Sequence, residues 1–166
     1  MRLQLELEID PERASQIAQE ATELFNVNLP EERVELGRWL NRNELYEVTL
    51  QLVPAEKARE RQDYFLIRAD ALALLDRWET LQKELDDRNV PLESYIDQAF
   101  KMRAAYERGE FRRAQRAWER SMLEAGNDVS RLRFLASYAQ RLGLTGYYQQ
   151  VLRKLAEMPR TMREAS

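Results

Sequence analysis

Apolar residues recur every three to four positions along most of this 166-residue chain. This is the period of helices that bury one face. The clearest case lies within residues 110–125, where apolar side chains follow one another at i, i+3, i+7, i+11 and i+14: Phe111, Ala114, Trp118, Met122 and Ala125. Polar and turn-forming residues interrupt the pattern at intervals. The pattern therefore predicts an all-α protein built from short amphipathic helices.

From Pro30 onward the pattern predicts helices in pairs. The expected ranges are 30–41 and 44–53, then 54–75 and a helix after Asp76, then 92–107 and 110–125, and finally 129–142 and 146–157. Pro54 suits the first turn of its helix, where a missing N–H is tolerated. We expect Asp76 and Thr145 to cap the helices that follow them. Gly126 is expected to end its helix in the left-handed conformation.

The turns inside these pairs keep a nearly constant spacing. Asn43, Asp76, Gly109 and Gly143 lie 33, 33 and 34 residues apart. A period of this length is typical of stacked helical arrays, in which no single unit buries its apolar face alone. The sequence therefore predicts an α-solenoid of about four antiparallel helix pairs. The aromatic residues of these helices are expected to pack in the core: Trp39, Phe65, Trp78, Phe111, Trp118 and Phe134.

The first 29 residues do not follow this scheme. Residues 2–9 alternate polar and apolar side chains, which is the period of a half-buried strand. A short strand and an irregular extension are equally good interpretations of so short a segment. Asp10, Pro11 and Glu12 favour a helix start, so a helix is expected from Pro11 to about Phe25. The expected organisation is an N-terminal extension over 1–29, a helical repeat domain over 30–159 and a tail over 160–166.

The helix pairs resemble tetratricopeptide repeats. The best match is the third pair, where Tyr106, Gly109, Phe111, Ala114 and Trp118 resemble that family's aromatic, glycine, aromatic, alanine, aromatic pattern. The resemblance covers about residues 30–159. It implies a right-handed stack of antiparallel helix pairs that binds proteins or peptides, without catalysis and without a cofactor.

Several kinds of chemistry are excluded by composition, because cysteine and histidine are both absent. Disulfides, thiolate nucleophiles and Cys/His zinc sites need these residues, as does the usual base of serine nucleophiles. The adjacent acidic pairs at 31–32 and 86–87 are interpreted as exposed helix ends rather than acid–base partners. The chain also lacks a glycine-rich phosphate loop. We therefore expect no enzymatic activity, no metal site and no cofactor.

The chain shows no signal for membrane insertion or secretion. Its longest clean apolar run, 71–75, is far too short to span a bilayer. The first twenty residues lack the apolar segment of a signal peptide. A cytoplasmic protein is the expectation, although a soluble domain of a larger anchored protein would have the same composition.

The formal charge of −3 is divided unevenly along the chain. Residues 1–99 carry −10, whereas residues 100–166 carry +7. In a linear stack this division predicts an acidic end and a basic end. The basic end would bind an acidic protein, an acidic peptide or phosphate groups, or else the two ends of different copies would meet head to tail. The alternative is that the charges are solvated helix faces that keep the protein in solution.

Arginine strongly outnumbers lysine in the basic half, and arginine binds carboxylate and phosphate through two parallel hydrogen bonds. In the helix expected over 110–125, Arg112, Arg116 and Arg120 stand at i, i+4 and i+8, away from the apolar stripe. Further arginines flank this row on the same and neighbouring helices. The predicted contact surface comprises Arg103, Arg112, Arg113, Arg116, Arg120, Arg131 and Arg133.

The interpretation that follows is a non-enzymatic scaffold that binds a protein or peptide of acidic character through a concave groove and this arginine-rich face. The overall acidic charge argues against nucleic acid, whose binding relies on domain-wide positive charge. The second interpretation is a homo-oligomer that joins copies through complementary acidic and basic ends.

Overall fold

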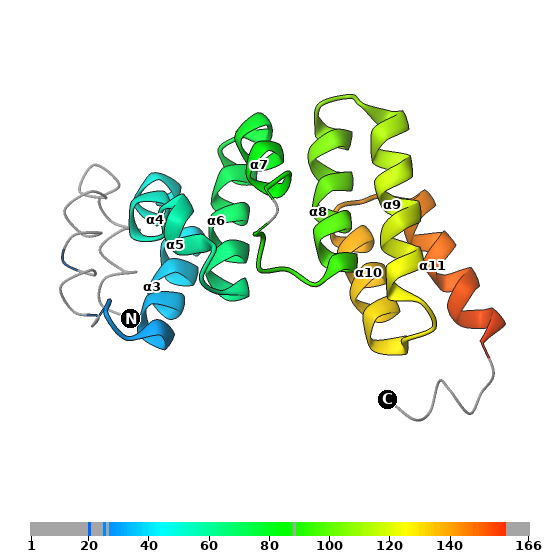
Figure 1. The fold of residues 1–166 in the computed structure, drawn as a ribbon, viewed down its shortest axis with the longest axis horizontal. Coiled ribbons are helices and arrows are strands. Elements are labelled where there is room, and N and C mark those ends of the chain that lie inside the picture. The colour runs from blue at the N-terminus through cyan, green and yellow to red at the C-terminus, as the bar shows by residue number, and fades with distance from the viewer. Residues whose placement is uncertain (1–19, 21–24, 26, 88, 159–166) are drawn as a thin grey trace. The chain divides into compact units, whose positions relative to one another are not determined.

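A computed structural model describes residues 20, 25, 27–87 and 89–158, and the regular structure within them is helical (Figure 1). The predicted all-α class is confirmed for these residues. The predicted strand over 2–9, the predicted helix over 11–25 except for two residues, and the tail over 160–166 lie outside the described residues. The chain divides into two compact units, Met1–Leu92 and Glu93–Ser166.

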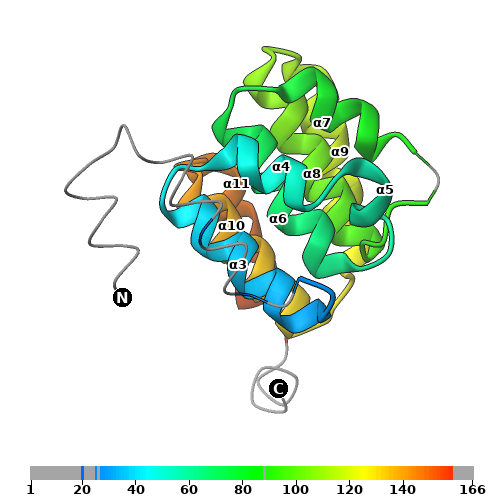
Figure 2. The same ribbon diagram turned by 90° about the vertical axis from the view of Figure 1, so that its left-hand side faces the viewer.

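The first unit is organised around one central helix. Its helices are α3 (Pro30–Arg42), α4 (Tyr46–Leu52), α5 (Ala55–Ala58), α6 (Gln62–Leu74) and α7 (Trp78–Leu85). Helix α6 packs against α3, α4, α5 and α7 (Figure 2). Its side chains are accordingly buried on several sides, as at Phe65, Ile67 and Ala73. This arrangement explains why α6 is rich in apolar residues around most of its circumference.

Arg68 joins three helices of the first unit. Its guanidinium nitrogens Nε and Nη2 donate to both carboxylate oxygens of Glu84 on α7, at 2.7–3.1 Å. Its Nη1 atom donates to the carbonyl of Val53, just after α4, at 3.0 Å. The Arg68 and Glu84 side chains are only 11% and 15% exposed. This ion pair is therefore shielded from water and held in place by additional hydrogen bonds.

The second unit contains two long helix pairs. Its helices are α8 (Ser94–Glu107), α9 (Phe111–Ala125), α10 (Val129–Arg141) and α11 (Thr145–Glu157). Helix α8 packs along α9, α10 packs along α11, and α10 also contacts α9 (Figure 1). Trp118, Met102 and Leu135 are fully buried between these helices. The Ser121 hydroxyl, also buried, donates to the carbonyl of Tyr95 at 2.6 Å.

Helices α3, α6, α8 and α10 end in turns of the same geometry. One residue in each turn has a φ between 58° and 76°: Glu44, Asp76, Gly109 and Gly143. These residues lie 32, 33 and 34 positions apart. In the third turn Gly109 N–H donates to the Tyr106 carbonyl at 2.9 Å, and Glu110 N–H donates to the Ala105 carbonyl at 2.8 Å. The other three turns contain the same two hydrogen bonds, so each is a Schellman motif.

The first of these turns differs from the prediction by one residue. Asn43 was expected at the turn, but its φ is −100°, and the left-handed residue is Glu44. The Asn43 side chain instead donates to the carbonyl of Trp39 at 2.8 Å. Asn adopts the left-handed region more readily than Glu does, which is why the sequence favoured the wrong residue.

Two predicted helix caps are also wrong, at Asp76 and Thr145. Asp76 occupies the left-handed turn position, and its carboxylate accepts a hydrogen bond from the Trp78 indole N–H. The N-cap of α7 is Arg77, which provides no side-chain hydrogen bond. Thr145 is the first residue of α11, and the N-cap is Leu144. In all four turns a single residue separates the left-handed residue from the next helix, so the turn itself fixes the cap position.

The single helix predicted over 54–75 is interrupted. Helix α5 ends at Ala58, and α6 begins at Gln62 after an extended Arg61 with φ −150° and ψ 144°. Ala58 and Tyr64 are both buried. On a continuous helix, residues six positions apart would point about 120° away from each other. The interruption allows both side chains to reach the core.

Asp63 supports the start of α6. Arg61 donates to its two carboxylate oxygens, from Nε at 3.0 Å and from Nη2 at 2.7 Å. The Tyr64 N–H donates to Oδ1 at 2.9 Å. Burial by itself would raise the pKa of the Asp63 carboxyl, but the hydrogen bonds from Arg61 and Tyr64 outweigh burial and lower it. The ionised form of Asp63 is therefore stabilised in the folded protein.

The predicted core aromatics are buried to different degrees. Phe65, Trp78 and Trp118 are buried, as predicted. Trp39 and Phe134 are half-buried. Phe111 is 61% exposed, so its assignment to the core was wrong. It is the first residue of α9, before the helix is enclosed by its neighbours, and the buried stripe starts at Ala114.

The ends of α9 and α11 depart from the predicted pattern in smaller ways. Gly126 has the expected positive φ of 58°, but its ψ of −132° lies in a region that glycine alone adopts readily, outside the left-handed helical region. On α11, Val151 is buried, whereas Leu152 is 42% exposed. The last helix therefore has an apolar edge that its neighbours cover only in part.

Candidate functional site on helix α9

Helix α9 has one buried side and one exposed side. The residues facing the core are small or aromatic, and all are buried: Ala114, Ala117, Trp118, Ser121 and Ala125. The Trp118 indole Nε1 donates to Gln150 Oε1 on α11 at 3.0 Å. These contacts fix the rotation of α9 in the second unit, and they leave its opposite side in contact with solvent.

The exposed side of α9 carries the predicted row of arginines. Arg112, Arg116 and Arg120 are all exposed, and their four-residue spacing places them on one stripe of the helix. We call these three residues the arginine ridge. Within the part of the chain that the structure describes, none of the three forms an ion pair. Their guanidinium groups are therefore available to a partner.

An apolar residue continues the same stripe. Leu123 is 76% exposed, more than any other large apolar residue among those described. It follows Arg116 by seven residues, which is close to two full helical turns, so the two side chains leave the helix in nearly the same direction. The exposed side of α9 thus combines positive charge with an apolar side chain at its C-terminal end.

The arginine ridge lowers the stability of the isolated helix. Arg112 lies in the first turn of α9, which contains no acidic residue, and there it faces the partial positive charge of the helix N-terminus. Arg112 with Arg116, and Arg116 with Arg120, are like-charge pairs at i and i+4. Such pairs cost about 0.2–0.5 kcal/mol each in a helix. The acidic neighbours Glu119 and Glu124, at i+3 from Arg116 and i+4 from Arg120, offset part of this repulsion.

Two other predicted contact residues are engaged within the molecule. Arg113 pairs with Glu110 at 3.4 Å. Arg131 pairs with Glu93 at 3.1 Å and lies over the ring of Tyr95, 5.3 Å from its centroid. Arg131 therefore links the start of α10 to the start of α8. The sequence pattern contained no signal for this structural role.

The last two predicted contact residues lie on other helices. Arg133 is exposed on α10, whereas Arg103 is half-buried on α8 and its Nε atom is fully buried. The structure thus places Arg112, Arg116 and Arg120 together in one row, with Arg113 beside them on the same helix.

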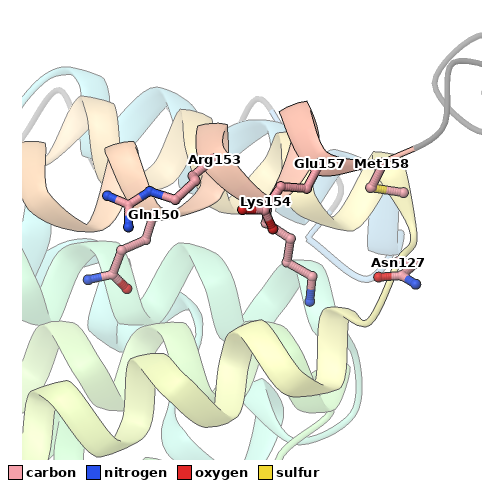
Figure 3. Close-up of a pocket in the computed structure, with 6 residues that line it drawn as sticks. All are labelled: Asn127, Gln150, Arg153, Lys154, Glu157 and Met158. Carbon is pink, nitrogen blue, oxygen red and sulfur yellow. The ribbon is translucent and has the colours of Figure 1, made fainter.

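A hollow of about 410 Å³ lies between α11 and the loop that follows α9 (Figure 3). Lys154 Nζ donates to the carbonyl of Met122 at 3.0 Å, and Gln150 accepts the hydrogen bond from Trp118. These two polar side chains therefore hold α11 against α9 and have less capacity for a ligand. The lining residues are Asn127, Gln150, Arg153, Lys154, Glu157 and Met158.

Another hollow, of about 600 Å³, lies between α3 and α6 in the first unit. Asn41 Nδ2 donates to the carbonyl of Ile67 at 2.9 Å, while Asn41 Oδ1 is buried with no hydrogen-bond partner among the described residues. Charges of both signs line the hollow, so it does not favour an acidic or a basic ligand. The lining residues are Glu35, Arg38, Asn41, Arg42, Asp63, Leu66, Ile67 and Asp70.

An aromatic cluster lies near the start of α9. The Tyr106 ring is 5.4 Å from that of Phe111 and 6.5 Å from that of Tyr147, edge-on in both cases. Burial raises the pKa of the Tyr147 hydroxyl, with smaller contributions from Tyr106 and Glu119. Sequence reasoning missed this partly exposed cluster, and the one available signal was the position of Phe111 at the first turn of its helix.

Among the described residues, no group of three or more acidic side chains is placed to hold a metal ion. No helix there has the length and apolar character needed to cross a membrane. No family model, curated protein or solved structure matches this chain. Its function is therefore inferred from its own residues and their geometry.

Proposed function

We propose that this chain is a non-enzymatic scaffold that binds an acidic protein or peptide through the arginine ridge. The observation that carries the proposal is that Arg112, Arg116 and Arg120 are exposed together and form no ion pair within the described residues. Guanidinium groups pair with carboxylates through two parallel hydrogen bonds. The surrounding unit, residues 93–166, also carries a formal charge of +5, which would attract an acidic partner from a distance.

The proposed architecture is a right-handed α-solenoid of tetratricopeptide-like repeats. It is supported by the four Schellman turns at spacings of 32–34 residues. Such a stack forms an extended concave binding surface. The hollow between α3 and α6 would then belong to this surface and provide a second contact region for a partner.

The test is affinity capture with the wild-type protein and two charge-reversal variants, at low and moderate salt. The ridge variant is Arg112→Glu, Arg116→Glu and Arg120→Glu. The matched control reverses three exposed cations elsewhere, Lys83, Arg141 and Arg153, so both variants change the net charge by the same amount. We expect one discrete protein to bind the wild type and the control but not the ridge variant. Equal capture by all three proteins would refute the proposal.

Self-assembly is the second candidate, because the two units have opposite charge. Residues 1–92 carry −8 and residues 93–166 carry +5, so the basic unit of one copy would attract the acidic unit of another. Sedimentation velocity of the pure protein over a wide concentration range tests this candidate. Oligomers that dissociate with added salt would support it, and a monomer at every concentration would refute it.

A further inference from the structure

The arginine ridge has a spacing that can be compared with the spacing of a partner's charges. A helix rises about 1.5 Å per residue, so successive ridge residues are about 6 Å apart along the axis of α9, and the whole ridge is about 12 Å long. Leu123 follows three residues beyond Arg120 on the same side of the helix. The surface is therefore a row of three cations that turns gradually around α9, with Leu123 beyond its C-terminal end and the exposed Glu119 beside it.

We infer that the arginine ridge and Leu123 bind an acidic amphipathic helix, with carboxylates at i, i+4 and i+8 and an apolar residue three positions beyond the carboxylate that meets Arg120. This inference rests on the proposed function and specifies its partner. Such a helix has the same axial charge spacing as α9, so its carboxylates can be placed opposite successive guanidinium groups. The partner's apolar side chain would cover Leu123 and remove its surface from water.

The exposed Leu123 favours a protein partner over a nucleic acid. A phosphate backbone can pair with the three arginines, but it provides no apolar group for a leucine that is 76% exposed. A protein segment satisfies both halves of the surface, whereas a nucleic acid satisfies only the charged half.

The geometry of the arginine ridge distinguishes a helical partner from an extended one. Acidic residues at alternate positions of an extended chain stand about 6.6–6.8 Å apart. The arginine row also turns by about 40° around α9 at each step, whereas alternate residues of an extended chain keep one direction. Bidentate pairing requires a defined geometry, so a helical partner can engage all three arginines better than an extended one.

The experiment uses two synthetic peptides of identical composition and charge with the full-length protein. One is a helix with glutamates at i, i+4 and i+8 and a leucine at i+11 or i−3, for parallel and antiparallel docking. The other has the same residues in an order that puts the glutamates on different faces. Binding is measured by titration calorimetry at two salt concentrations. We expect the patterned peptide to bind on the order of tenfold more tightly, a difference of about 1.4 kcal/mol.

Two protein variants test whether the peptides bind at the arginine ridge and Leu123. Leu123→Ala should weaken the patterned peptide several-fold and leave the scrambled peptide unchanged, and its exposed position means that it should fold normally. The triple ridge reversal should abolish both interactions. Equal affinity for the two peptides, with no effect of Leu123→Ala, would overturn the helical partner and leave the proposed function intact.

Three further outcomes would also overturn the helical partner. Tighter binding of a single-stranded RNA than of either peptide would favour phosphate recognition. Salt-sensitive self-association that is lost in the ridge reversal would assign the ridge to a second copy of this chain. Peptide binding that survives the ridge reversal would refute both the helical partner and the proposed function, because the ridge would then not be the binding surface.

Discussion

The first prediction is that Arg112→Glu stabilises the free protein. Arg112 is exposed in the first turn of α9, and within the described residues it has no acidic partner. Glutamate at this position would interact favourably with the helix N-terminus. It would also stand four residues before Arg116, which is the better order for a helical Glu–Arg pair. One substitution therefore reverses two unfavourable interactions.

The expected gain is about 1 kcal/mol. A charge near a helix end contributes about 0.3–1 kcal/mol at an exposed position and low ionic strength. Replacing a repulsive i,i+4 pair by an attractive one adds a few tenths of a kcal/mol from each of the two changes. Replacing a cation by an anion removes an unfavourable interaction and adds a favourable one, so both contribute to the gain. Because Arg112 is exposed to water, each contribution is expected near the lower end of its range.

Urea unfolding followed by circular dichroism measures this gain. The matched control is Arg141→Glu, since Arg141 is an exposed cation in the last turn of α10, where positive charge is favourable. The two substitutions are chemically identical and lie at opposite helix ends. We expect the urea midpoint to rise for Arg112→Glu and to fall for Arg141→Glu, with an unchanged m value in both.

Salt dependence provides the refuting result. The Debye length falls from about 30 Å at 0.01 M salt to about 3 Å at 1 M, so both shifts should shrink as salt is added. If Arg112→Glu lowers the urea midpoint, or raises it equally at all salt concentrations, electrostatic repulsion at Arg112 does not destabilise α9. The exposure of the ridge would then be no argument for a binding role.

Three further predictions concern the first unit and the turns. Arg68→Met should lower the free energy of unfolding by about 3–5 kcal/mol because it leaves Glu84 shielded and unpaired, and replacing both residues with Met should recover most of the loss in denaturant curves. Glu44→Gly should raise thermal stability by about 1 kcal/mol, while Gly143→Ala should lower it by a similar amount, because both positions have positive φ. The folded-state pKa of Asp63 is lowered, so its contribution is full above an unfolded pKa of about 3.9 and is lost as pH falls through the folded pKa. Unfolding curves from pH 7 to pH 2 should therefore show Asp63→Asn losing stability mainly at the upper end of this range, and a constant difference would contradict the assignment.

The helix pairs could be predicted from the sequence because each helix keeps a period near 3.6 residues. The stripe predicted on α9 matches its buried face at Ala114, Trp118 and Ala125, whereas Met122 is half-buried and Phe111 is exposed. Helix α6 was harder, since it is buried on several sides and so has little periodicity to mark its start after Arg61. The interruption after Ala58 depends on contacts with distant residues, which a local pattern does not contain.

The arginine ridge could also be predicted, because three residues at four-residue intervals share a face wherever the helix lies. The role of Arg131 could not. Its partner Glu93 and the ring of Tyr95 are nearly forty residues away in the sequence, and only the packing of α10 near α8 brings them together. Leu123 escaped notice for the opposite reason, since a single leucine in a helix is usually part of the core.

The Schellman turns have a consequence for how freely this sequence can vary. Each turn is closed by two main-chain hydrogen bonds, and any residue except proline can supply them. The left-handed position is occupied by Glu, Asp, Gly and Gly in the four turns, so the side chain there adjusts stability while the chain reversal stays the same. Substitutions can therefore remove the recognisable turn residue from one helix pair after another and leave the backbone path of each pair unchanged.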